Sequence, residues 1–103
     1  MLVTKKYEKD TIATFKLVNG DEIVAKVVDE QINSFVLSKP TTVIPSAQGI
    51  ALMQSLFTGD LNKDITLDKR HIMMDSVSAE EIKNHYIQTT TGIQPVSQGG
   101  LLI

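Results

Sequence analysis

Short runs of alternating apolar and polar residues occupy much of the first half of the chain. In the stretch "FKLVNGDEIVAKV", residues 15–27, two such runs flank the pair Asn19-Gly20. A period of two is typical of strands that place one face on a core, and Asn-Gly supplies the positive φ angles of a tight turn. The pattern therefore predicts a β-hairpin. The apolar residues expected on its core face are Phe15, Leu17, Ile23, Ala25 and Val27.

The pattern continues beyond a polar bend, "VDEQIN". Alternation resumes in "SFVLSK", where Phe35 and Leu37 are expected to face inward. Pro40 and Pro45 then bracket "TTVI". Because proline cannot donate a hydrogen bond to a neighbouring strand, this part is predicted to be a sheet edge, a bulge or a strand end. Further strands are predicted in "ITLD" and "HIMMDSV".

Residues 49–57, "GIALMQSLF", form the most apolar run of the chain. Read as a strand, the run is apolar on both faces, whereas a strand of a small barrel normally has one face in water. One interpretation is that a second surface is covered by something, such as another subunit. The alternative is a helix or strand that is buried within the monomer.

A helix is predicted after the last strand. Ser78-Ala79-Glu80-Glu81 has the spacing of a capping box, in which Ser78 caps the N–H of Glu81 and Glu81 reaches back. The helix is expected to begin at residue 79, with Ala79, Ile82 and Tyr86 on one face. Thr89–91 and Gly92 weaken and end it.

Sequential strands with short links and one helix predict a mainly β fold, a small and strongly bent antiparallel sheet closed in part into a barrel. Four segments are expected: a flexible N-terminal arm (1–10), the barrel domain (11–77), the C-terminal helix (78–91) and a flexible tail (92–103).

Composition adds limits to this picture. A chain of 103 residues with 42% hydrophobic residues is enough for one domain, and chains of this size often gain stability by forming oligomers. The net charge of −2 gives no overall basic field for nucleic acid. No run is long enough to span a membrane, and "MLVTKKYEKD" has no apolar core of a secretory signal, so the expected location is the cytoplasm.

Candidate chemistry is sparse. The chain has no cysteine, no nucleophile elbow and no glycine-rich phosphate loop, so we expect neither an enzyme nor a bound cofactor. His71 and His85 lack the spacing of a metal site. The triplet Lys69-Arg70-His71 concentrates positive charge between two predicted strands. It is either a solvated turn or a set of contacts to phosphates and bases.

The opening stretch and the bend after it resemble the first signature of the Sm-like family, which includes the bacterial Hfq type. The residues that match are Leu17, Gly20, Ile23, Asp29, Ile32 and Asn33. "KRHIM" is similar to the Lys-His link of the Hfq type, with Arg70 and His71 on matching positions. Ala25 replaces the second glycine of the signature, and the Arg-Gly of the second signature is absent. "YIQTTTGI" is similar to small Sm-like proteins of marine bacteriophages, which would imply a host cytoplasm.

The resemblance implies a strongly bent five-stranded antiparallel barrel whose copies join edge to edge into a ring and bind single-stranded RNA, with DNA also possible. It implies that Asn33 and Gln31 contact bases, that Lys69, Arg70 and His71 contact phosphates or bases at the pore, and that Asp29 orders the loop. Partners would be other copies of the chain and nucleic acid, with no membrane. Two alternatives stay open: a structural or adaptor ring without nucleic acid, and a monomeric barrel that binds a peptide.

Overall fold

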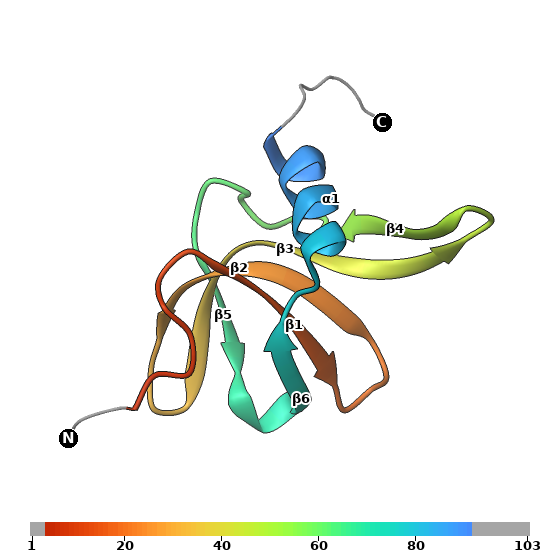
Figure 1. Cartoon of the computed structure of the whole chain (residues 1–103). Coiled ribbons are helices and arrows are strands. Elements are labelled where there is room, and N and C mark those ends of the chain that lie inside the picture. Colours follow the sequence, from red (N-terminus) through yellow and green to blue (C-terminus); the bar gives the residue numbers. More distant parts are fainter. Residues whose placement is uncertain (1–3, 92–103) are drawn as a thin grey trace.

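The computed structural model describes residues 4–91, and within them the chain forms a mainly β structure with one C-terminal helix (Figure 1). The elements, in chain order, are β1 (Thr11–Leu17), β2 (Glu22–Glu30), β3 (Ser34–Ser46), β4 (Gly49–Gln54), β5 (Ile65–Asp68), the short 3-10 helix η1 (Lys69–His71), β6 (Ile72–Val77) and α1 (Glu80–Thr91). The predicted tail, residues 92–103, lies outside the described residues.

The predicted hairpin around Asn19-Gly20 is confirmed. Strands β1 and β2 are antiparallel, with Phe15 opposite Ile23 and Ala13 opposite Ala25. Gly20 has a φ of 97°, a value that its lack of a Cβ makes accessible, whereas Asn19, also expected at positive φ, does not adopt it. The turn chemistry of the sequence therefore sets the register of the first two strands.

All strand pairs are antiparallel, in the order β4-β3-β2-β1-β6, and β5 also pairs with β3. The first part of β3 lies between β2 and β5, and Thr41 and Thr42 further along lie between β2 and β4. Strands β4 and β5 therefore follow one another along the same edge of β3. Pro40 and Pro45 lie in the second half of β3, the half that pairs with β4.

The expected number of strands, five, is wrong for the described residues, which contain six. The extra strand arises because β3 extends through both prolines and returns as β4. The described strands do not close into a barrel. Among them, β5 pairs only with β3 and β6 pairs only with β1, so the two ends of the sheet are not joined to each other. The antiparallel and mainly β character is as predicted.

Both faces of the β1–β2 hairpin are covered, by different clusters. One face packs Phe15 and Val27 against Phe35 and Leu37, and all four side chains are buried. The other face packs Ile12 and Val24 against Tyr86 of α1. The period of two that is visible in the sequence thus separates two small cores, one within the bent sheet and one beneath the helix.

Helix α1 begins at Glu80, one residue after the predicted start. The Ser78 hydroxyl lies 2.7 Å from the hydroxyl of Thr14, and the Ser78 N–H donates to Ile12 O at 3.0 Å. The predicted capping bond to Glu81 is therefore replaced by contacts that fix the start of the helix to β1.

Tyr86 fastens the helix to an irregular part of the sheet. Its side chain is 2% exposed, and its hydroxyl donates to Ser38 O at 2.7 Å and accepts from the Lys26 N–H at 3.2 Å. The pairing of β2 with β3 shifts register on either side of Lys26. The phenol therefore supplies a partner to backbone groups near this irregularity.

Residues 40–59, which we call the arm, contain the second half of β3, all of β4 and the start of the next loop. Figure 1 shows the tip of the β3–β4 hairpin extending beyond the other strands. The strand interpretation of this region is confirmed for Gly49–Gln54. Burial within the monomer is wrong, because Ile50, Met53 and Phe57 are 39%, 46% and 76% exposed.

Candidate functional site

Two groups of predicted site residues that are far apart in sequence lie side by side in the structure. The β2–β3 bend carries Gln31 and Asn33, and η1 carries Lys69, Arg70 and His71. The backbone N–H of Lys69 donates to Asn33 O at 2.9 Å, which joins the bend to η1 directly. All the residues predicted to contact nucleic acid therefore belong to one end of the molecule.

We call this region the charged end. It comprises the N-terminal segment 5–7, the bend 31–33, η1 and the acidic residues that face them. Those acidic residues are Asp29, Glu30, Asp68 and Asp75.

The bend is held by its own backbone and side chains. The Gln31 N–H donates to Ser34 O at 2.8 Å, and the Ser34 hydroxyl donates to Gln31 Oε1 at 3.3 Å. The side chains of Gln31 and Asn33 are exposed, so their amides can reach a ligand. The Gln31 amide N–H2 group is available as a donor beside its Oε1.

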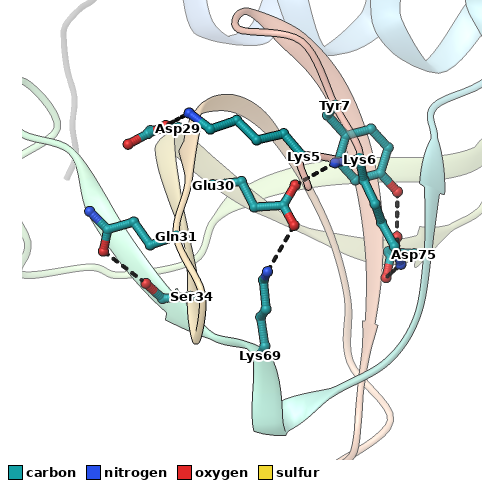
Figure 2. Close-up of polar contacts among 9 residues, drawn as sticks. All are labelled: Lys5, Lys6, Tyr7, Asp29, Glu30, Gln31, Ser34, Lys69 and Asp75. Atoms are coloured by element: carbon teal, nitrogen blue, oxygen red, sulfur yellow. Dashed lines mark hydrogen bonds and ion pairs between the residues drawn. The ribbon is translucent and has the colours of Figure 1, made fainter. Parts of the chain in front are cut away.

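Asp29, expected to order the bend, has an N-terminal partner. Its Oδ1 accepts a hydrogen bond from Lys5 Nζ at 2.7 Å, and this bond is the main reason that the pKa of Asp29 lies below its ordinary value (Figure 2). The contact ties the N-terminal segment to the end of β2.

Lys69 is engaged within the charged end. Its Nζ lies 2.8 Å from Glu30 Oε2, in an ion pair whose Glu30 side chain is 3% exposed, and it also lies 5.0 Å above the ring of Phe35. The second oxygen of Glu30 accepts from the Lys6 N–H at 2.7 Å (Figure 2). A buried carboxylate that loses its cation is costly. Lys69 is therefore a poor candidate for a phosphate contact, although it was predicted as one.

Arg70 is the exposed cation of η1, with a side chain that is 84% exposed. Its guanidinium donates to Asp68 through Nη2 at 2.7 Å and through Nε at 3.1 Å, and Asp68 also caps η1 by accepting from the Arg70 N–H. These bonds lower the pKa of Asp68 to about 2. Because an exposed pair contributes little to stability, the guanidinium can move to another anion at low cost.

The N-terminal segment completes the charged end, and its contacts were not anticipated from the sequence. The Tyr7 hydroxyl donates to Asp75 on β6, and Lys6 Nζ lies 3.2 Å from the same carboxylate (Figure 2). The ring of Tyr7 packs against Phe15 and Phe35, with centroids at 6.4 and 5.9 Å. A single aromatic residue within a polar stretch was the available signal. Burial and the Asp75 carboxylate raise the pKa of Tyr7 above its ordinary value.

A small cavity lies between this segment and η1. Its volume is about 190 Å³. Its lining includes two acidic and two basic residues, so it has no excess of either charge. The lining residues are Lys6, Glu30, Phe35, Lys69, Ile72 and Asp75.

The positive and negative charges of the charged end are equal in number. Four cations face four carboxylates, and His71 is exposed beside them. A phosphate that binds here must compete with a carboxylate for each cation. The four pairs are Lys5–Asp29, Lys6–Asp75, Lys69–Glu30 and Arg70–Asp68.

Among residues 4–91, no group of three or more histidine, cysteine, aspartate or glutamate side chains is arranged to hold a metal ion. The helix in the same part of the chain is neither long enough nor apolar enough to cross a membrane.

No model of a protein family matches the chain, and no curated protein matches it either.

Proposed function

We propose that this protein is a divergent Sm-like protein that assembles into a ring and binds single-stranded nucleic acid, in the first place RNA, at the charged end. The observation that carries the proposal is the hydrogen bond from the Lys69 N–H to Asn33 O, at 2.9 Å. This bond joins the bend of the segment that resembles the first signature to the link that resembles the Hfq type, with Gln31, Asn33, Arg70 and His71 all exposed.

The Sm-like interpretation is supported by the connections of the last strands. β5 pairs with β3, β6 pairs with β1, and η1 joins β5 to β6 with no longer loop. Under this interpretation, β5 and β6 take the places of the fourth and fifth strands of the family. The β3–β4 hairpin is then an addition between the third and fourth places, which accounts for the sixth strand.

Ring assembly is supported by the free edges of β5 and β6. Among the described strands, each pairs with a single neighbour, so each has an open edge. On β6, Met73, Met74 and Val77 are 63%, 66% and 51% exposed. Joining β5 of one copy to β6 of the next would cover these edges, and a head-to-tail contact that closes into a ring leaves none open.

Recognition of the ligand would then divide between two kinds of contact. The amides of Asn33 and Gln31 can hydrogen bond to base edges, which single strands expose. Arg70 can exchange Asp68 for a phosphate, and His71 can hydrogen bond to a base or stack on it. Repetition around a ring would multiply these few contacts. Lys69 would position η1 through Glu30 and would not contact the ligand.

Binding of labelled oligonucleotides tests the proposal. We expect oligo-U and mixed RNA to bind at low salt, and Arg70→Ala to weaken binding and to lower the slope of log affinity against log salt by about one. Lys63→Ala is the matched control, since Lys63 is an exposed cation in the loop after β4. An Arg70→Ala variant that binds like the Lys63→Ala variant would remove the proposed mechanism. A single-stranded DNA oligomer in the same assay separates RNA from DNA binding.

A structural or adaptor ring without nucleic acid is the second candidate. The one-to-one pairing of cations with carboxylates favours it, because the charged end offers little unpaired positive charge. An intact oligomer that binds neither RNA nor DNA at low salt would support this function over the first.

A further inference from the structure

The arm has a composition unlike that of the rest of the chain. Residues 40–59 contain no charged side chain, although the whole chain has 10 lysines and arginines and 12 aspartates and glutamates. The arm also carries exposed apolar side chains, with Ile50 at 39%, Met53 at 46% and Phe57 at 76%. An uncharged and apolar projection is poorly suited to permanent contact with water.

Within the described part of the chain, the outer edge of β4 has no strand partner and carries none of the residues that usually block pairing with another strand. Among the described residues β4 pairs with β3 alone, so one row of its backbone N–H and C=O groups has no strand partner. Soluble proteins usually protect such an edge with lysine, proline or a bulge. Strand β4 has neither a lysine nor a proline, and its pairing with β3 runs without a register shift from Thr41–Gln54 to Ser46–Gly49.

We propose that the arm is a two-fold interface, in which β4 pairs antiparallel with β4 of a second copy. A two-fold contact brings a surface against itself, so any charged residue near the axis would meet its own like charge. The arm has no charged residue anywhere along its length, so two copies can meet there without repulsion between like charges. The other apolar edge, β6, contains Asp75 and has Met74 opposite Lys16 on β1. A two-fold contact through β6 would therefore bring like charges close to each other.

The geometry of the fold allows this contact. The tip of the hairpin extends beyond the other strands, so two copies can approach along β4 before their bodies meet (Figure 1). At the other end of the hairpin, Val43 and Leu52 pack against the cluster of Ile12, Val24 and Tyr86. The arm is thus anchored to the body while its outer edge stays open.

The contact is separate from the ring contact proposed above, because the ring uses β5 and β6. It would join copies in pairs, whether those copies are single chains or members of rings. The occupant is a second copy of this chain, and a foreign strand or an apolar peptide is a competing outcome.

The first experiment measures the mass of the full chain in solution by light scattering and by native mass spectrometry. Ile50→Lys with Met53→Lys should halve the number of subunits, with an unchanged circular dichroism spectrum. Ile87→Lys on α1, where Ile87 is 46% exposed, is the matched control and should leave the mass unchanged. A folded arm variant with the mass of the wild type would overturn the proposal.

A companion variant separates this proposal from the ring. Met74→Lys should break pairing through β6 and leave dimers held by the arm. If Met74→Lys yields monomers and the arm variant keeps the full mass, the ring stands and the arm interface is wrong. If the wild type is a dimer that Met74→Lys does not change, the arm interface stands and the ring is wrong. A monomeric wild type overturns both.

A cysteine scan supplies a test that does not depend on breaking the arm. The chain has no cysteine, and antiparallel pairing about a two-fold axis places one residue of β4 directly opposite itself, within the range of a disulfide. Single substitutions by cysteine at residues 50–53 should give one position that forms dimers under mild oxidation much more completely than Ile87→Cys. Equal yields at all five positions would contradict two-fold pairing.

Discussion

The charged end and the arm differ in how their side chains are paired and buried. Within the charged end, three of the four ion pairs join segments that are 24, 39 and 69 residues apart, and one carboxylate, Glu30, is almost fully buried. The arm has no charged residue, and its apolar side chains remain in water. The charged end therefore completes its contacts inside one chain, whereas the proposed two-fold contact would cover the arm with a second copy. Stability of the single chain should depend on the first region, and association on the second.

The largest expected effect comes from Glu30. Glu30→Ala removes the partner of Lys69 and of the Lys6 N–H, and loss of one member of a buried pair costs about 3 kcal/mol. Urea unfolding should show this decrease in the free energy of unfolding, while Glu8→Ala, at an exposed position in the same part of the chain, should stay within about 0.5 kcal/mol of the wild type. A Glu30→Ala variant as stable as Glu8→Ala would mean that the charged end does not hold the fold.

The next effect tests the junction at which the arm leaves the body. Tyr86→Phe keeps the ring but removes the hydroxyl that bonds Ser38 O and the Lys26 N–H, which should cost about 1–3 kcal/mol. Ile87→Ala, on the adjacent and exposed position of the helix, should cost less. Equal unfolding midpoints for the two variants would show that the phenol contributes only packing.

Alkaline pH should act on the same junction. Burial raises the pKa of Tyr86 from 10.0 to about 12. Because the folded state holds the proton more tightly, this contribution to stability is present below pH 10 and is lost as the pH rises towards 12. The chain has two tyrosines and no tryptophan, so absorbance at 295 nm reports both phenols. Ionisation of both near pH 10 in the folded protein would contradict the burial of Tyr86.

Acid below pH 4 should act first on the charged end. The pKa of Asp68 is lowered from 3.8 to about 2, and that of Asp29 is also lowered. The depressed values mean that this contribution is present above pH 4 and is lost as the pH falls towards 2, with a small effect because both pairs are exposed. Hydrogen exchange should therefore rise at η1 and at residues 5–7 before it rises in β3 and β4. Simultaneous exchange in both regions would show that they are not independent.

The smallest effect is expected from salt on the arm contact. Raising sodium chloride from about 50 to 500 mM should leave association through the arm unchanged, since screening acts on charges and the arm has none. Nucleic-acid binding at the charged end should weaken strongly over the same range. Dilution experiments by light scattering check the first expectation. Salt-sensitive association would show that charged residues take part in the contact.

Much of the fold was accessible from local sequence. The hairpin at Asn19-Gly20, the strands at Phe35 and at β6, and the helix start within one residue all follow from period and turn chemistry. The number of strands, five, was wrong because it was taken from the family resemblance, whereas the run at 49–57 adds a sixth strand. Pro40 and Pro45 were expected at a sheet edge, a bulge or a strand end. They lie instead within a strand of 13 residues whose neighbours change along its length.

The candidate site was accessible only in part. The resemblance singled out the bend and the basic triplet, and the structure places them together through the Lys69–Asn33 bond. In the structure, Lys69 forms an ion pair with Glu30, and Asp29 forms one with Lys5. No local pattern marks these pairs, because each depends on which distant segments the sheet brings together.

By itself, the sequence determined the parts of this protein that depend on neighbouring residues: strand period, the tight turn at Gly20, the approximate start of α1 and the absence of charge in the arm. The tertiary structure decided which cations are paired, that Tyr7 and Tyr86 are anchors, and that the apolar run at β4 lies at an open edge. The physical reason is the same in each case. Burial and ion pairing depend on distances between segments, which are set only when the sheet has formed.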